Sequence, residues 1–511
     1  MGTSRLLYRG TLGDEAMTQR AGFFLAARLR VGDVVALDGA VGTGKSVFAR
    51  ALIRARFGEA GPIPSPGFAL VQEYGGAGER LLHADLYRLV YAQEMRELGL
   101  WEDADAMVVL EWARRAPDDV PRTHLRVQLQ FARAEGARRL QIYGDAAWAR
   151  RLHGLAQFLT RQRALGRFVR RHGWGEAHLS PVRGDASERR FERLLATDKG
   201  ERRAILMDWP YAEQPAAARR YARATALADD PAAFGAMAQF LCAEGIAAPQ
   251  IFAADYARGF VLMEDLGARG LAGAHACAAP FLRPAYLEAV EVLLHLRRGA
   301  PSQLPLARRP WRLPRTTAKI LHEELHVFLQ WYAPHVGRTV SPALQRSWRA
   351  VWAGVMPLML DDGEALVLRD YHSPNLLWRA EHQTWARLGV IDVQDGILGH
   401  AAYDLVSLLQ DARVTLGARE ERFWLRHYLR EVKRREGACD AAAFRRSYAA
   451  LGAQRACRIA GIFVRLAQRD KKPHYLAHLP RVLAYLRRNL KAEGLEELAS
   501  WFARHFPELA A

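Results

Sequence analysis

Long hydrophobic runs, paired cysteines and an apolar N-terminal segment are all missing from this sequence of 511 residues. No stretch approaches the ~18–20 apolar residues that a membrane-spanning helix needs, so no membrane contact is expected. Residues 1–7 lack the basic region and apolar stretch of a signal peptide, which makes a cytoplasmic location the expectation. The four cysteines form no Cys-x-x-Cys pair, which argues against a disulfide framework and a structural zinc site.

Lysine is scarce, yet the net charge is +18 because arginine is abundant. Nearly all of the excess falls after residue 150, where it is dispersed through Ala- and Arg-rich segments such as residues 161–171. A strongly basic chain suggests nucleic-acid binding. The dispersal favours a solvated, arginine-rich surface instead, with a patch for an acidic partner or a polyphosphate ligand as the alternative.

The chain exceeds the size at which one hydrophobic core stops growing, so several domains are expected. Residues 1–147 alternate short apolar strands with helices, including a helix over 45–57, and this order predicts a mostly parallel sheet. Period-two patterns over 125–131 and 138–143 predict an antiparallel hairpin that completes the sheet.

The remainder of the chain has a different character. Residues 148–267 begin with a helix and continue with predicted paired strands over 190–196 and 203–208. Residues 268–511 are mainly amphipathic helix. A small lobe rich in strands followed by a helical lobe is therefore expected.

A glycine-rich turn before the first predicted helix carries the pattern Gly-x-x-x-x-Gly-Lys-Ser. Successive backbone N–H groups of such a turn point into one concavity at a helix N-terminus, where phosphate binds. Lys45 is placed to meet the β- and γ-phosphates of ATP, and the Ser46 hydroxyl to ligate Mg²⁺. The nucleotide-binding residues expected here are Gly39, Gly42, Thr43, Gly44, Lys45 and Ser46.

Three further motifs follow this P-loop in order: residues 63–71 with Ser-Pro-Gly at their centre, His-x-Asp-x-Tyr-Arg over 83–88, and Leu-Glu-Trp over 110–112. They resemble the motifs of TsaE-type ATPases. These proteins are the ATPase subunit of the bacterial machinery that makes threonylcarbamoyladenosine in tRNA. The resemblance covers about residues 8–145. It implies an α/β P-loop NTPase domain whose partners are the other protein subunits of that machinery and, indirectly, tRNA.

Asp85 and Glu111 end predicted strands on the side where an open α/β sheet binds ligands. Two carboxylates beside a phosphate site suit Mg²⁺ ligation and orientation of the attacking water, so Glu111 is assigned to the metal and Asp85 to the water. The alternative makes both carboxylates surface caps, with Trp112 in the core. The switch threonine of the TsaE family is Gly67 here, which predicts weakened or differently tuned nucleotide hydrolysis.

A second phosphate-handling pattern lies far from the first, where residues 370–375 read Asp-Tyr-His-Ser-Pro-Asn and Asp392 ends a later strand. In two-lobed kinases such an Asp orients the substrate hydroxyl and accepts its proton, while the Asn and the second Asp hold Mg²⁺. Asp370 is therefore the predicted catalytic residue, and Asn375 and Asp392 are the predicted metal ligands. The loop resembles that of aminoglycoside-phosphotransferase-like kinases, which implies an α+β two-lobed protein-kinase-like domain that uses ATP and Mg²⁺.

Six stretches are similar to the anomeric amino-sugar kinases of cell-wall recycling, of the AmgK type. They are residues 184–191, 259–267, 324–332, 370–375, 392–395 and 403–411. The resemblance covers about residues 165–490 and implies phosphorylation of the C1 hydroxyl of N-acetylmuramate or N-acetylglucosamine. It also implies that Asp404 braces the catalytic loop.

Two departures from the wider kinase pattern concern the phosphates. Leu368 stands where a histidine usually precedes the catalytic Asp, and no phosphate-binding lysine occupies residues 204–208. Phosphate contacts are therefore expected from Ser187, Arg189 and the backbone of the turn at Gly184, with Arg203 as a poorer candidate.

Residues 322–326 match the His-Glu-x-x-His pattern of zinc metalloproteases. No third ligand follows at a suitable spacing, and apolar residues at helical intervals make one face of this segment, which favours an ordinary core helix. Three functions are then considered: a bifunctional ATPase and sugar kinase, an active sugar kinase whose P-loop domain is a degenerate interaction or regulatory module, and a nucleic-acid-binding protein with an inert kinase fold. The first is the main hypothesis.

Overall fold

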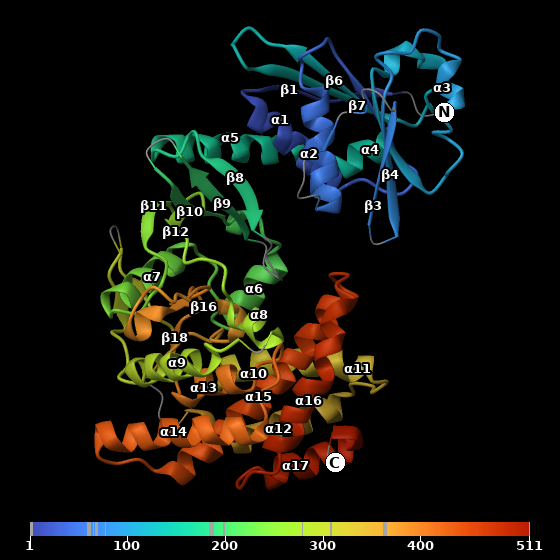
Figure 1. Cartoon of the computed structure of the whole chain (residues 1–511). Helices are drawn as coiled ribbons and strands as arrows, with labels where there is room; N and C mark the ends of the chain where they lie inside the picture. Colours follow the sequence, from blue (N-terminus) through green and yellow to red (C-terminus); the bar gives the residue numbers. More distant parts are fainter. Residues whose placement is uncertain are drawn as a thin grey trace. The chain divides into compact units, whose positions relative to one another are not determined.

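The computed structural model describes residues 4–58, 63–64, 66, 70–76, 78–182, 189–197, 200–277, 279–306, 309–360 and 365–509. The chain divides into two compact units, Met1–Gly175 and Glu176–Ala511 (Figure 1). Gly67, Gly184 and Ser187 lie outside the described residues. Within the described part of the chain, no helix is long and apolar enough to cross a membrane.

The first unit is built on a seven-stranded sheet in the order β1-β7-β6-β2-β5-β4-β3. Its strands are β1 (Arg5–Leu12), β2 (Val34–Asp38), β3 (Val71–Gly76), β4 (Glu79–Asp85), β5 (Ala106–Glu111), β6 (Leu125–Phe131) and β7 (Arg138–Gly144). The central pairs β2–β5, β2–β6 and β4–β5 are parallel, and β6–β7 is the expected antiparallel hairpin. The predicted α/β fold is confirmed.

Alternate residues of the central strand β2 enter two different cores. Val35 and Leu37 belong to a cluster with helices α1 (Glu15–Ala26) and α2 (Lys45–Phe57), whereas Val34 and Ala36 belong to a second cluster with β4 and the segment that follows it. Every residue of β2 is buried. The near-continuous apolar run is therefore explained by a strand covered on both faces.

Helix α5 (Leu155–Arg171) lies in the first unit, so the division at Gly175 falls 28 residues later than the boundary expected after residue 147. Leu155 and Leu159 are buried in the same cluster as α1, and the rings of Phe24 and Phe158 lie 5.1 Å apart. The helix was expected to lead the kinase lobe. Its apolar stripe instead covers α1.

The second unit begins with a five-stranded antiparallel sheet in the order β11-β12-β10-β9-β8. The strands are β8 (His178–Val182), β9 (Arg190–Ala196), β10 (Arg202–Asp208), β11 (Ile251–Asp255) and β12 (Phe260–Glu264). Between β10 and β11 the chain forms α6 (Ala216–Ala224) and α7 (Ala232–Ala243). The expected pairing of 190–196 with 203–208 is confirmed by the register of β9 on β10.

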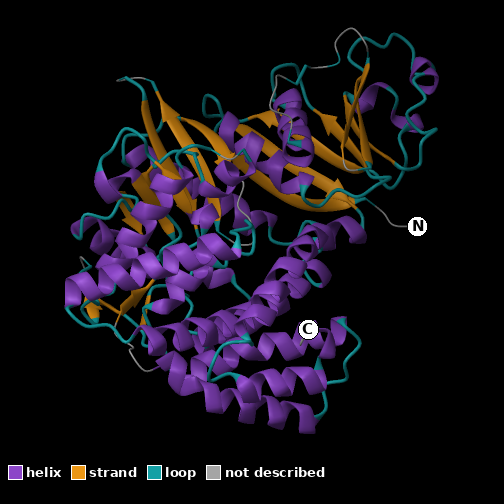
Figure 2. Ribbon diagram, turned by 60° about the horizontal axis from the view of Figure 1, so that its bottom comes forward, coloured by secondary structure: helices purple, strands orange, loops and turns teal. Residues whose placement is uncertain are grey.

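The rest of this unit is mainly helical, with a few short strands among the helices (Figure 2). The longest helix, α15 (Ala441–Gln468), is buried on most sides and packs against α10 (Ala318–Val327), α12 (Pro342–Leu360), α13 (Ala402–Leu409) and α16 (Leu479–Asn489). Other helices of the region are α8 (Leu271–Ala276), α9 (Leu282–Leu296), α14 (Ala418–Glu436) and α17 (Glu496–His505). The two-lobed kinase-like plan is confirmed.

Candidate functional sites

The P-loop of the first unit has the backbone that its glycines predict. Gly39, Gly42 and Gly44 have φ angles of 149°, 77° and 96°, and Gly44 caps the N-terminus of α2. A Cβ on Gly39 would lie 2.2 Å from the carbonyl oxygen of Leu129. Only glycine fits this position, so the turn that could hold phosphate is built into the sequence.

Lys45 folds back over this turn, where its Nζ donates to the carbonyl oxygens of Gly39 and Ala40 at 2.9 and 3.0 Å. The same Nζ lies 3.7 Å from the ring centre of Trp112, a cation–π contact. Burial lowers the pKa of Lys45, although nearby carboxylates, Glu111 foremost, oppose the shift. Lys45 is thus held at the mouth of the turn by contacts that an anion could replace.

Glu111, at the end of β5, links two groups across the site. Its Oε2 accepts from the Ser46 hydroxyl at 2.9 Å, and its Oε1 lies 3.0 Å from His83 Nε2. Glu111 and His83 are both fully buried. A hydroxyl and a carboxylate at this distance suit Mg²⁺, which prefers oxygen ligands.

Asp85 sits opposite Glu111 in the parallel register of β4 on β5. Burial raises the pKa of Asp85, and the charge of Glu111 adds to the shift. The structure therefore brings Asp85, Glu111, Lys45 and Ser46 to one end of the sheet, as expected for the carboxyl ends of parallel strands.

A cavity of about 500 Å³ opens beside the P-loop. This size falls in the range of small-molecule sites. Part of its wall is aromatic, and part carries charge from arginines, one of which, Arg114, lies 3.4 Å from Asp38. The lining includes Asp38, Gly39, Thr43, Trp112, Arg114, Arg115 and Phe131.

In the second unit, two short strands bring the predicted kinase residues together. Strands β16 (Leu376–Trp378) and β17 (Leu388–Val390) are antiparallel, and Ile391 N donates to Asn375 O at 3.0 Å. Asn375 and Asp392 therefore lie side by side at the same end of this pair. The Asn375 amide also donates to the backbone oxygen of Asp370 at 3.0 Å, which joins all three residues in one constellation.

Arg189 closes the constellation from the sheet side, with its Nη1 2.7 Å from Asp392 Oδ1. Asp392 has a φ of +63°, a left-handed conformation that aspartate tolerates better than most residues. Arg203, by contrast, is exposed and pairs with Glu201. Carboxylate and amide oxygens are ligands that suit Mg²⁺, so Asn375 and Asp392 fit the metal that a kinase requires.

The charge state of Asp370 is controlled by its neighbours. Burial alone would raise its pKa, but positive groups around it, His372 when protonated and the arginines Arg458 and Arg455, hold the pKa below its ordinary value. The Nε2 of His372 lies 3.9 Å from Asp370 Oδ1, and burial lowers the pKa of this histidine. Asp370 is therefore ionised at neutral pH and able to accept a hydrogen bond from a substrate hydroxyl.

Two buried aspartates, Asp404 and Asp411, hold the loop around Asp370 by accepting hydrogen bonds from its backbone. Asp404 accepts from the backbone N–H groups of Leu368 and Arg369 at 2.5 and 2.9 Å. Asp411 accepts from the N–H of Ser373 at 2.8 Å and from its hydroxyl. Burial raises the pKa of Asp404 to about 7 against the two backbone hydrogen bonds.

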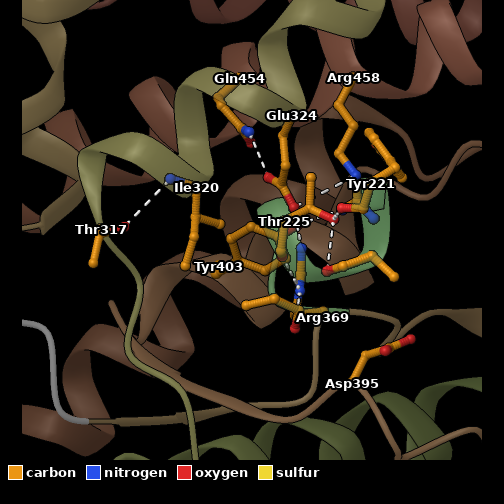
Figure 3. A network of polar contacts seen from close by, with 12 residues as sticks. Tyr221, Thr225, Thr317, Ile320, Glu324, Arg369, Asp395, Tyr403, Gln454 and Arg458 are labelled. Carbon is orange, nitrogen blue, oxygen red and sulfur yellow. Dashed lines mark hydrogen bonds and ion pairs between the residues drawn. The ribbon is translucent and has the colours of Figure 1, made fainter. Parts of the chain in front are cut away.

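A buried ion pair that sequence reasoning missed anchors the same loop (Figure 3). Arg369, with a φ of +68°, donates to the carbonyl oxygens of Thr225 and Ala226 at 2.9 and 3.1 Å and to Glu324 Oε1. The other oxygen of Glu324 accepts from Gln454 at 2.7 Å. Burial opposes both charges, yet the charges of Arg458 and Arg369 keep the pKa of Glu324 lowered, and the charge of Glu324 keeps that of Arg369 raised.

The His-Glu-x-x-His segment lies on α10 and continues into the core through a stacked pair of rings, Phe328 and Tyr332. The buried glutamate of this helix is Glu324, which faces Arg369, and not Glu323, which is exposed. Among the described residues, no three His, Cys, Asp or Glu side chains form a group that could hold a metal ion. The segment is therefore part of the kinase core.

Comparison with known proteins assigns both units. Residues 178–439, more than half of the chain, match the "Phosphotransferase enzyme family". The chain belongs to this family. An N-acetylmuramate/N-acetylglucosamine kinase of Caulobacter vibrioides is 35% identical over 360 residues, which cover 68% of this chain and 97% of the relative. A choline kinase from Cryptosporidium parvum aligns in structure over 66% of this chain and 99% of its own, with 10% identity and a TM-score of 0.43.

The first unit of this phosphotransferase has relatives of its own. Residues 12–140 match the family "Threonylcarbamoyl adenosine biosynthesis protein TsaE". A protein of that name from Rickettsia conorii is 38% identical over 104 residues, which cover 20% of this chain and 59% of the relative. The chain is thus a fusion of a TsaE-type domain with a phosphotransferase domain.

Proposed function

We propose that the second unit transfers the γ-phosphoryl group of ATP to the C1 hydroxyl of N-acetylmuramate or N-acetylglucosamine. The observation that carries this proposal is the joined set Asp370, Asn375 and Asp392, in a domain that aligns with almost the whole of a kinase named for these sugars. A base and two metal ligands are the protein groups that phosphoryl transfer needs.

In the proposed reaction, ionised Asp370 accepts a hydrogen bond from the C1 hydroxyl, orients its oxygen toward the phosphoryl group and takes up its proton. A hemiacetal hydroxyl is more acidic than an ordinary alcohol, so orientation is the larger contribution. Asn375 and Asp392 would hold Mg²⁺, which neutralises charge on the transferred group. Arg189 would contact the phosphates of ATP, and Ser187 and Gly184, the other expected phosphate contacts, lie outside the described residues.

For the first unit we propose that it binds and hydrolyses ATP as a subunit of the machinery that makes threonylcarbamoyladenosine in tRNA. Its partners would be the other protein subunits of that machinery. Lys45 would meet the phosphates, Ser46 and Glu111 the Mg²⁺, and Asp85 the attacking water. Both proposed activities consume ATP and are assigned to the cytoplasm. The glycine at position 67 supports a second candidate, a degenerate domain that binds nucleotide and acts as an interaction or regulatory module.

One experiment tests both assignments: ATP turnover by the whole chain with and without N-acetylmuramate, with the sugar product followed by ³¹P and ¹H NMR. Phosphate on C1 is the expected result. Phosphate at another position, or on an aminoglycoside offered in parallel but on neither amino sugar, would contradict the kinase assignment. ATP turnover measured without sugar is expected to come from the P-loop domain. If this turnover is lost in a Lys45→Ala variant while sugar phosphorylation continues, the two activities belong to different domains.

A further inference from the structure

Arg138, the first residue of β7, lies against the P-loop of the first unit. Its Nε donates to the carbonyl oxygen of Thr43 at 3.2 Å, and its Nη2 donates to that of Gly42 at 3.1 Å. Arg138 and Thr43 are 95 residues apart in the sequence. The P-loop pattern therefore does not include the arginine that contacts two successive residues of the turn.

The guanidinium of Arg138 is itself held in place. Its Nη1 donates to the carbonyl oxygen of Ala137 at 3.0 Å, so each of its three nitrogens has an acceptor. The guanidinium carbon lies 4.9 Å from the ring centre of Phe131, an exposed residue that also lines the cavity beside the P-loop. A planar group with this many partners is fixed in one orientation.

The contacts with Arg138 determine where the N–H groups of the turn point. In a trans peptide group, the carbonyl oxygen and the N–H of the next residue point in opposite directions. Because the oxygens of Gly42 and Thr43 face Arg138, the N–H groups of Thr43 and Gly44 face away from it. The Thr43 N–H is used within the turn, by the oxygen of Ala40 at 3.4 Å. The Gly44 N–H, at the N-terminus of α2, is left for a phosphate.

The second cation on the turn has a different task. Lys45 donates to the oxygens of Gly39 and Ala40, and these contacts would be exchanged for the phosphates that its ammonium group is expected to meet. Arg138 contacts the opposite ends of the peptide groups that present N–H to phosphate, so its contacts can persist when phosphate is bound. A turn that is ordered before binding loses less conformational freedom on binding.

We infer that Arg138 is a positioning residue for nucleotide binding by the first unit, because it holds the P-loop in the conformation that receives phosphate. Arg138 acts through the backbone of Gly42 and Thr43. This role rests on the nucleotide binding proposed for the first unit, and it applies whether that unit hydrolyses ATP or serves as a nucleotide-binding module.

The test is the affinity of the full-length chain for a fluorescent ATP analogue, taking as first-unit binding the part that disappears in Lys45→Ala. Arg138→Gln should weaken this affinity by about 5–20-fold, because charge-assisted hydrogen bonds to the turn are lost, while the amount bound at saturation stays the same. Arg138→Lys keeps the charge but lacks the planar fork, so it should lose most of the same affinity.

The matched control is Arg139→Gln. Arg139 is the next residue of β7, is exposed, and points to the opposite face of the strand. Its variant should bind the analogue with the affinity of the wild type.

Three results would overturn the role of Arg138. Unchanged affinity in Arg138→Gln would show that the turn needs no support from this residue. Wild-type affinity in Arg138→Lys would show that positive charge alone is sufficient. A smaller amount bound at saturation with unchanged affinity would mean that Arg138 only stabilises the fold. A wild-type chain whose binding of the analogue does not depend on Lys45 would instead contradict nucleotide binding by the first unit, so the two failures are distinguishable.

Discussion

Replacing Glu324 by glutamine tests whether the buried ion pair supports the kinase fold. Glutamine has nearly the same volume, so the change removes charge while the packing around α10 is retained. Arg369 keeps its two carbonyl partners but loses the carboxylate, and Arg458 loses the same neighbour. Breaking a buried pair by removing one partner costs about 3–5 kcal/mol, because an uncompensated charge stays in the interior.

For a unit that spans Glu176–Ala511, a loss of this size lowers the melting temperature by roughly 4–7 °C. Differential scanning calorimetry on the full-length chain measures the change, and the transition of the first unit serves as an internal reference. The control is Glu508→Gln, which removes an exposed pair with Arg338 and should cost less than about 1 kcal/mol. Equal melting temperatures for Glu324→Gln and the wild type would show that the pair contributes nothing net.

Three further predictions address the two sites and the support beneath the loop. Asp370→Asn should lower phosphoryl transfer by roughly 10²–10⁴-fold with little change in nucleotide affinity, whereas Asp392→Asn should also raise the Mg²⁺ concentration needed for half-maximal rate; near-normal turnover in Asp370→Asn would contradict its catalytic role. Lys45→Ala should abolish nucleotide binding to the first unit, measured with a fluorescent ATP analogue, whereas sugar phosphorylation should continue. Loss of sugar phosphorylation in this variant would mean that the two domains are coupled. Because the pKa of Asp404 is raised from 3.8 to about 7, its contribution to stability is fully present below about pH 4 and is lost as pH rises toward 7. Urea unfolding at a series of pH values should show this loss in the wild type, and the free energy of unfolding should depend less on pH in Asp404→Asn. An equal pH dependence in the two proteins would contradict this role of Asp404.

Local patterns predicted the elements that depend on local chemistry. The helix over 45–57, the hairpin and the paired strands of the small lobe follow from glycine turns and from periods of two and 3.6 residues, and all are present. Helix α5 was recognised as a helix but assigned to the second domain, because an amphipathic stripe indicates that something covers it without saying what.

The ion pair beneath the catalytic loop could not be predicted in the same way. Glu324 and Arg369 are 45 residues apart, and a single sequence does not reveal which charged residues pair in the interior. The metalloprotease-like pattern drew attention to Glu323, its exposed neighbour. A charged residue within an otherwise apolar helical stripe, as at Glu324, was the signal available.

The place of α5 decides where this chain can be divided. A fragment that ends at residue 147 would leave the face of α1 uncovered, and a fragment that begins at residue 148 would carry Leu155 and Leu159 into water. Each such leucine costs about 1.5–3 kcal/mol when exposed, and uncovered apolar faces lead to aggregation. Gene fragments cut after Gly175 keep the helix with its partner, so this is the position at which the two units can be expressed as separate, soluble proteins.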